Sequence, residues 1–380
     1  MKRISFFILF TLIALSVTAK NLESGYYRVS NVGSGRYAYI TDNTGSIMYE
    51  AATADMGALE LWKDHSRTFS DPASVIYAEF ISSGSNQGQY DLRAQGVGVH
   101  ELIGFYVTVY NKSGYYQVYA QGKYLTDSNS GSSDKGTFGT KGSGNYRNWK
   151  ISPVNTTDEY FGIKPTVSVQ DRYFHPFYAD FGFRLVGEGM KVWLVKDVNE
   201  NAVIIAPFEG ETVPAQTPVI IECSNSRAVD NKLDLVYDYS DLGQTNLLAG
   251  VFFNNDHRPK SVDARTVFDK NTMRVLGVTA DGNLGYVLST VAADSKGKQY
   301  LEANQSYLPV ESDLPAEIPV MTESEYEEWI ASSVPASVRE EDEVNVYMLS
   351  GRNLGKVRKD EINSLPAGIY IIGRKKVVID

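Results

Sequence analysis

The stretch SGYYRVSNVGSGRYAYITD at residues 24–42 decides the fold, because the chain contains a second version of it. That version, SGYYQVYAQGKYLTD, occupies residues 113–127. Tyr27 and Val29 alternate with polar neighbours, and apolar side chains at every second position are typical of half-buried β-strands. The Gly-, Ser- and Asn-rich segments between the strands are typical of turns. The repeat therefore predicts duplicated β-hairpin units.

The repeat extends beyond these two copies. The motif at residues 61–63, Leu-Trp-Lys, is echoed by Asn-Trp-Lys at residues 148–150. A degenerate middle copy is formed by residues 75–80 and 89–93. Repeated units of this size need mutual contact to bury their apolar faces. We therefore expect residues 22–155 to fold as three β-hairpin lobes around one core.

Three such lobes, with a tryptophan near the lobe end, resemble the ricin-type β-trefoil. The Gln-x-Trp that closes the lobes of that family appears here as Glu60-Leu61-Trp62 and Arg147-Asn148-Trp149, and no tryptophan closes the middle lobe. The resemblance implies a β-trefoil-like domain over residues 22–155. It also implies carbohydrate binding, which we treat as an expectation.

Two strand ends in this region carry the residue types that sugar recognition uses. An aromatic face lies under a pyranose ring, while carboxylates and amides hydrogen-bond its hydroxyls. The candidate ligand-binding residues stand at matching positions of the first and third lobes: Tyr39, Asp42, Asn43, Tyr124, Asp127 and Asn129. The alternative is that the tyrosines fill the core and the Asp and Asn residues form ordinary turns.

Residues 158–320 have a different sequence pattern, in which short apolar runs are separated by Gly and Pro. This pattern predicts a β-sandwich. The phrases VPAQTPVIIE (residues 213–222) and LEANQSYLP (residues 301–309) are similar to a module of secreted Bacteroidetes proteins. His175 and Asp180 lie in an aromatic-rich stretch that we interpret as the sandwich interior.

Residues 321–343 form an acidic linker with one predicted helix. Thr322-Glu323-Ser324-Glu325 is a capping-box pattern. Tyr326, Trp329 and Ile330 then fall on one helical face. We expect Trp329 to dock this helix onto a neighbouring domain.

The sequence of residues 344–380 predicts a small C-terminal β-domain. It would contain a strand at residues 344–352 and a hairpin that turns at residues 373–374. The motifs VYMLSG (residues 346–351) and LPAGIYII (residues 365–372) resemble the C-terminal sorting domain of the Bacteroidetes type IX secretion pathway. The resemblance implies a role in export or surface attachment. A small capping β-domain is the alternative.

The N-terminus predicts export. Lys2 and Arg3 precede an apolar run from residue 4 to 15, and small residues at 17–19 fit a cleavage site. The apolar run is shorter than the roughly 20 residues that span a bilayer. We therefore expect residues 1–19 to be a signal peptide, no transmembrane segment, and an extracellular or outer-surface location.

The net charge and the absence of certain motifs argue against several classes of function. The formal net charge of −10 argues against nucleic acid as a partner. Cys223 is the one cysteine of the chain, and we expect it to be buried and unreactive. The four histidines lack the spacing that chelates a metal from one element. No nucleotide-binding or nucleophile motif occurs, so no cofactor is expected.

The sequence thus favours an all-β, non-catalytic, secreted or surface-exposed binding protein. Its predicted role is carbohydrate binding or adhesion, with a glycan or a host or cell-surface protein as partner. One alternative is a structural or protein-interaction component of the surface. A second is a glycoside hydrolase with a trefoil accessory module, which requires two carboxylates about 5–9 Å apart in a cleft.

Overall fold

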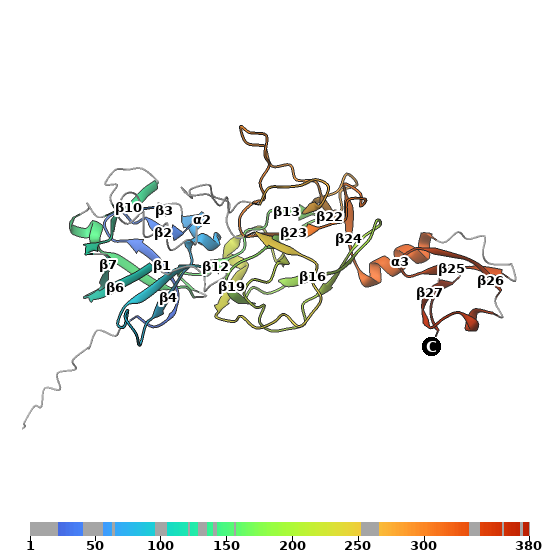
Figure 1. Ribbon diagram of the computed structural model, residues 1–380, viewed down its shortest axis with the longest axis horizontal. Coiled ribbons are helices and arrows are strands. Elements are labelled where there is room, and N and C mark those ends of the chain that lie inside the picture. Colours follow the sequence, from blue (N-terminus) through green and yellow to red (C-terminus); the bar gives the residue numbers. More distant parts are fainter. Residues whose placement is uncertain are drawn as a thin grey trace, which may run out of the picture.

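The chain is mostly β-strand, and three β-rich regions follow one another along its long axis in the computed structural model (Figure 1). The all-β prediction is confirmed. The structure describes residues 22–40, 56–62, 65–95, 105–120, 122–127, 135–139, 143–155, 157–251, 266–333, 343–358, 361–372 and 375–379. The proposed signal peptide, residues 1–19, lies outside these ranges. Neither of the helices within them has the length and apolarity to cross a bilayer.

The N-terminal region, here called the barrel, consists of a single eleven-stranded sheet with three short helical turns. Its strands are β1 (Gly25–Asn31), β2 (Tyr37–Ile40), β3 (Met56–Trp62), β4 (Ile76–Phe80), β5 (Tyr90–Ala94), β6 (Phe105–Lys112), β7 (Tyr115–Ala120), β8 (Lys123–Tyr124), β9 (Thr126–Asp127), β10 (Lys135–Gly139) and β11 (Trp149–Pro153). The turns are α2 (His65–Thr68), η1 (Pro72–Ser74) and η2 (Gly144–Arg147).

Strand β1 closes the barrel because it pairs with both β4 and β11. The neighbours β4–β5–β6–β7–β11 complete a closed ring of six strands. Strand β3 of the β2–β3 hairpin pairs with β10, which in turn pairs with β9. The predicted middle copy, residues 75–80 and 89–93, corresponds to the antiparallel pair β4–β5, and residues 96–104 lie outside the described residues. The three-lobed trefoil therefore stays a prediction.

The inward face of the ring carries the predicted alternating side chains. Tyr27 and Val29 of β1 are buried in one cluster with Val118 of β7. Trp149 of β11 is fully buried there, and its indole Nε1 donates a hydrogen bond to the Leu125 carbonyl at 3.0 Å. The duplicated sequence thus supplies one shared core.

The central region contains a three-stranded and a ten-stranded sheet. The smaller sheet is formed by β12 (Phe161–Gly162), β15 (Gly182–Leu185) and β19 (Lys232–Val236), and η3 (Ala228–Asp230) precedes its last strand. The larger is formed by β13 (Val167–Val169), β14 (Arg172–Phe177), β16 (Lys191–Val198), β17 (Val203–Pro207), β18 (Val219–Cys223), β20 (Ala249–Val251), β21 (Met273–Val278), β22 (Leu284–Val287), β23 (Gln305–Pro309) and β24 (Ile318–Thr322).

Strands β16 and β18 are apolar on both faces because both faces are covered. Val192 and Leu194 of β16 pack in the cluster that includes the three-stranded sheet. Trp193 and Val195 point the other way, into a cluster with β21 to β24 of the same large sheet. The large sheet therefore folds over itself as a sandwich, and the small sheet adds a third layer. Cys223, at the end of β18, is buried as predicted.

The helix α3 (Glu323–Ser333) leads to a four-stranded C-terminal sheet in the order β26-β25-β27-β28. Its strands are β25 (Glu343–Met348), β26 (Asn353–Arg358), β27 (Gly368–Ile372) and β28 (Lys375–Ile379), with the turn η5 (Ile362–Ser364). The capping box is confirmed: the Thr322 backbone N–H donates to the Glu325 carboxylate at 2.7 Å, and the Glu325 N–H donates to Thr322 Oγ1 at 3.3 Å.

The docking face of α3 differs from the prediction. Tyr326 and Ile330 are buried between β17 and β27. Trp329 is 38% exposed and stacks on the Tyr326 ring at 5.8 Å. Residues 326 and 330 are four apart and lie on one line of the helix, so they form the contact, and Trp329 lies at its margin.

Candidate functional site

The structure places two of the predicted ligand-binding residues in the interior. Tyr39 is 3% exposed and packs with Ala73. Asp127 is 1% exposed and forms an ion pair with Arg36, whose Nη2 and Nε lie 2.7 and 2.9 Å from the carboxylate Oδ2. Neither side chain is presented to a ligand at the surface, so neither belongs to the candidate site.

Asp127 can be buried because it forms an ion pair with Arg36, which is buried beside it. The side chain of Arg36 is 2% exposed, and a guanidinium that has lost its water needs a carboxylate to compensate. Arg36 comes from the first lobe and Asp127 from the third, so the pair joins two repeats. The core interpretation therefore holds for Tyr39, whereas Asp127 lies in strand β9 and not in the turn that the alternative predicted. Asp42, Asn43 and Asn129 lie outside the described residues.

Tyr124 is half-buried at the surface and lies in a group of three tyrosines, here called the tyrosine surface. The ring centroids of Tyr119 and Tyr124 are 5.1 Å apart. Tyr110 lies 6.3 Å from Tyr119 and 6.4 Å from Tyr124, and it is 41% exposed. These separations are typical of aromatic clusters that keep their faces at fixed angles. The three rings therefore form a pre-arranged surface.

The register of three neighbouring strands brings these rings together. Tyr110 of β6 faces Gln117 of β7, and Tyr119 of β7 faces Tyr124 of β8. Directly paired residues share a face of the sheet, while Val109 and its partner on β7 point to the core. The tyrosines thus stand on the outer face of the barrel.

Cations and amides border the tyrosine surface. The Lys112 ammonium lies 5.8 Å from the Tyr110 ring centroid, and the Arg147 guanidinium lies 5.8 Å from that of Tyr124. The Gln117 amide donates to Asn148 Oδ1 at 3.0 Å, which fixes its orientation. Aromatic faces bordered by hydrogen-bond donors suit a polyhydroxylated ring.

Sequence reasoning found Tyr124 but missed Tyr110 and Tyr119. The signal was present, since Tyr110 alternates with Val109 and Tyr119 with Val118, so the tyrosines fall on the polar side of each strand. Matching positions between lobes do not identify these two residues, because neither tyrosine has an equivalent in the first lobe.

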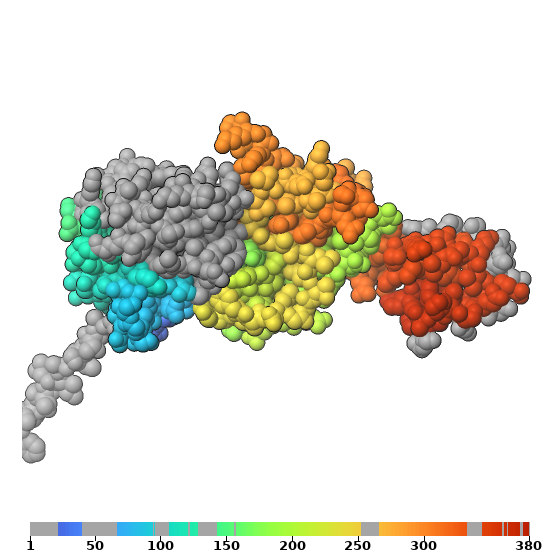
Figure 2. All heavy atoms as spheres, viewed as in Figure 1, coloured from blue at the N-terminus to red at the C-terminus, as the bar shows by residue number. Residues whose placement is uncertain are grey.

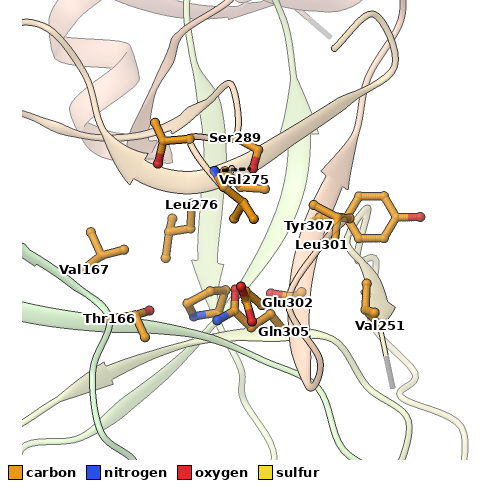
Figure 3. Close-up of a pocket in the computed structure, with 14 residues that line it drawn as sticks. Thr166, Val167, Val251, Val275, Leu276, Ser289, Leu301, Glu302, Gln305 and Tyr307 are labelled. Atoms are coloured by element: carbon orange, nitrogen blue, oxygen red, sulfur yellow. Dashed lines mark hydrogen bonds between the residues drawn. The ribbon is translucent and has the colours of Figure 1, made fainter. Parts of the chain in front are cut away.

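A separate cavity of about 150 Å³ lies in the central region, where the large sheet folds over (Figure 3). Val167 and Leu276 line it from β13 and β21, and Gln305 lines it from β23. Glu302 is the one carboxylate among its lining residues. A glycoside hydrolase needs two such groups, so this cavity does not supply that chemistry.

His175 lies next to the cavity lining and is half-buried between its neighbours on β14. Its Nδ1 is 3.3 Å from the Thr166 hydroxyl, and its ring is 6.1 Å from that of Phe177. Burial lowers the pKa of His175 to about 4, so the imidazole is neutral at physiological pH. Within the described ranges, no group of three His, Cys, Asp or Glu side chains could hold a metal ion.

Comparison with known proteins does not assign the chain to a family. No family model and no curated protein match the chain. Among solved structures, a mosquitocidal holotoxin is similar with a TM-score of 0.25 and 11% identity, over 78% of this chain and 45% of that one. Cry35Ab1 is similar with a TM-score of 0.22 and 14% identity, over 44% of this chain and 47% of that one. The chain thus spans less than half the length of either, and scores this low do not assign a common fold.

Proposed function

We propose that this chain is an exported, non-catalytic protein that binds saccharides through the tyrosine surface of its barrel. The observation that carries the proposal is the placement of Tyr110, Tyr119 and Tyr124 within 5.1–6.4 Å of one another on an outer face. Tyrosine offers an apolar ring for stacking and a polar tip for hydroxyl groups. We expect binding to be weak per site and strengthened by multivalent ligands.

The rest of the proposal rests on the sequence. A signal peptide at residues 1–19 and a sorting-like domain at residues 344–380 would place the protein outside the cell or at its outer surface. The trefoil resemblance of residues 22–155 supports a lectin-like role, and the closed ring of six strands is compatible with it. A host or cell-surface glycan would then be the partner.

A glycan-array screen of residues 20–380 tests the proposal, with Tyr110→Ala and Tyr110→Phe as the matched pair. Loss of stacking should weaken saccharide binding about tenfold in Tyr110→Ala, whereas Tyr110→Phe keeps the ring and should retain most of it. Acidic glycans belong on the array, because Lys112 and Arg147 border the surface. A folded Tyr110→Ala variant that binds like the parent chain would refute this site.

A protein-contact role is the second candidate, favoured by apolar exposure in the C-terminal sheet. Ile369 and Val378 are direct cross-strand partners and are 40% and 60% exposed. Exposed apolar patches mark contact surfaces more often than chance. This role predicts that Ile369→Ser and Val378→Ser weaken surface attachment of the full chain without altering saccharide binding.

A further inference from the structure

A second set of chemically matched side chains lies on the outer face of the β4–β5 hairpin, on the side that meets the central region. Tyr77 faces Arg93 across the two strands, and Glu79 faces Asp91. Paired residues of this kind share one face of a sheet. In Figure 2 the blue spheres of residues 65–95 adjoin the yellow-green spheres of the central region along the lower edge of the molecule.

Arg93 is held in a defined orientation by two carboxylates. Its Nη2 lies 2.6 Å from Asp91 Oδ2 and 3.0 Å from Glu79 Oε2, and its Nε donates to Asp91 Oδ2 at 2.6 Å. The Asp91 side chain is 3% exposed, whereas those of Arg93 and Glu79 are 22% and 45% exposed. Among the described residues these contacts use Nε and Nη2, which leaves the Nη1 donors for a ligand.

The central region contributes an exposed aromatic ring to the same place. Tyr237, which directly follows β19, is 54% exposed. Its ring centroid lies 5.2 Å from that of Tyr77 and 5.2 Å from that of Tyr239. The Tyr239 hydroxyl donates to the Asp180 carbonyl at 2.7 Å, which fixes the segment. Tyr237 is therefore exposed but held in position from two sides.

Tyr77 links Tyr237 to Arg93, because it faces Arg93 across the β4–β5 pair and its ring centroid lies 5.2 Å from that of Tyr237. Burial, followed by the neighbouring Tyr237 phenol, raises the pKa of Tyr77 to about 12. An aromatic face, a cationic donor and a carboxylate acceptor thus meet at one surface, although they come from two regions of the chain.

We propose that Tyr237, Arg93 and Glu79 form a second saccharide site, separate from the tyrosine surface. A pyranose ring would stack on Tyr237, while Arg93 donates to, and Glu79 accepts from, its hydroxyls. The two carboxylates outweigh the one guanidinium, so the local charge favours a neutral sugar over an acidic one. The tyrosine surface is instead bordered by two cations, Lys112 and Arg147.

Affinity electrophoresis of residues 20–380 tests this inference, with mannan and galactomannan as neutral probes and chondroitin sulfate as the acidic one. Tyr237→Ala should weaken retardation by the neutral polysaccharides about tenfold and leave that by chondroitin sulfate unchanged. Because Tyr237 is largely exposed, the variant should fold. Glu79→Gln should produce a smaller loss in the same direction, since it keeps the oxygen but not its charge.

Tyr110→Ala serves as the matched control and separates the two sites. The second site predicts that this variant still binds the neutral polysaccharides and loses affinity only for ligands of the tyrosine surface. If neither neutral probe retards the parent chain, or if Tyr237→Ala retards as the parent does, the second site is refuted. Neither result bears on the tyrosine surface, which is tested separately by the Tyr110 variants.

Discussion

At the residue scale, the same ion-pair chemistry serves two purposes in the barrel. Arg36 and Asp127 are both buried, and their pairing joins the first lobe to the third. Arg93 pairs with Asp91 in the same way, but its side chain remains 22% exposed. If one partner of a fully buried ion pair turned to a ligand, the other would be left as an unpaired buried charge, which is strongly unfavourable. A partly exposed guanidinium keeps donors available, so of these two arginines it is Arg93 that can offer hydrogen bonds to a ligand.

The first prediction concerns the buried pair. Asp127→Ala should destabilise the chain by about 3–5 kcal/mol, because it leaves the Arg36 guanidinium buried without its carboxylate. The free energy of unfolding from urea titration measures this cost. The double variant Arg36→Met/Asp127→Leu should recover most of the loss, since apolar residues of similar volume need no compensating charge. Equal losses in the single and double variants would contradict the pairing argument.

A second prediction follows from His175, whose pKa is lowered by burial to about 4. The unfolded chain binds this proton with a pKa of about 6.5, so unfolding takes up a proton between pH 6.5 and 4. Stability that is complete above pH 6.5 is therefore lost as the pH falls. Between pH 7.5 and 5.0 this loss should be about 2 kcal/mol.

The measurement for His175 is the free energy of unfolding at both pH values, compared with His175→Gln. Glutamine cannot protonate, so the variant should lose about 2 kcal/mol less than the parent chain over this interval. Other groups titrate in both proteins and cancel in the difference. The same pH dependence in both would show that the imidazole does not resist protonation in the fold.

At the scale of elements, local patterns predicted several strands and the linker helix α3. The apolar run at residues 219–222 and the capping box at Thr322 depend on neighbours within four residues, and both are found as predicted. The strand at residues 24–29 is also found, but it is buried on both faces and not on one, because Tyr26 and Arg28 are covered by the central region. The burial of Asp127 in an ion pair could not be predicted from such local patterns. Its partner Arg36 lies 91 residues away, and only the closed barrel brings the two together.

The third prediction tests the helix that joins the last two regions. Ile330 of α3 is 4% exposed and packs with Ile204 of β17 and Ile371 of β27. Ile330→Ala should cost about 2–4 kcal/mol, because it opens a cavity between two regions. Hydrogen exchange at β27 should rise by more than exchange at β18, since the C-terminal sheet opens locally first.

Trp329→Ala provides the control for this element, because Trp329 lies on the same helix but is 38% exposed. It should cost about 1 kcal/mol or less, the scale of one ring–ring contact. If Trp329→Ala opened the C-terminal sheet as much as Ile330→Ala, the tryptophan would be the docking residue after all.

At the scale of the whole molecule, the barrel and the central region share both apolar and polar interior. Tyr26 of β1 packs edge-on against Phe181 at 5.9 Å, within a cluster that spans both regions. Arg28 is buried, and its Nη1 donates to the carbonyls of Glu159 and Tyr160 at 3.0 and 2.7 Å. Because these contacts fix the two regions relative to each other, a ligand site built from both can be pre-arranged.

The polar part of this junction is a reciprocal amide pair. Gln95 Nε2 donates to Asn304 Oδ1 at 3.2 Å, and Asn304 Nδ2 donates to Gln95 Oε1 at 2.8 Å and to the Tyr178 carbonyl at 3.0 Å. Both residues are buried, and both have left-handed backbones, with φ of 59° and 56°. Such backbones cost free energy in non-glycine residues, so the amide contacts must offset that cost.

The fourth prediction is that this pair couples the two regions. Gln95→Ala and Asn304→Ala should each cost about 1–3 kcal/mol by stranding a buried amide, while the double variant should cost less than their sum by about 1–2 kcal/mol. Gln170→Ala is the control, because Gln170 has the same left-handed backbone (φ 48°) but is exposed, and should change stability by about 0.5 kcal/mol or less. Additive losses in the double variant would mean that the amide pair does not couple the barrel to the central region, and the Tyr237 site would then depend on the packing of Tyr26 and Tyr77 and on the Arg28 hydrogen bonds.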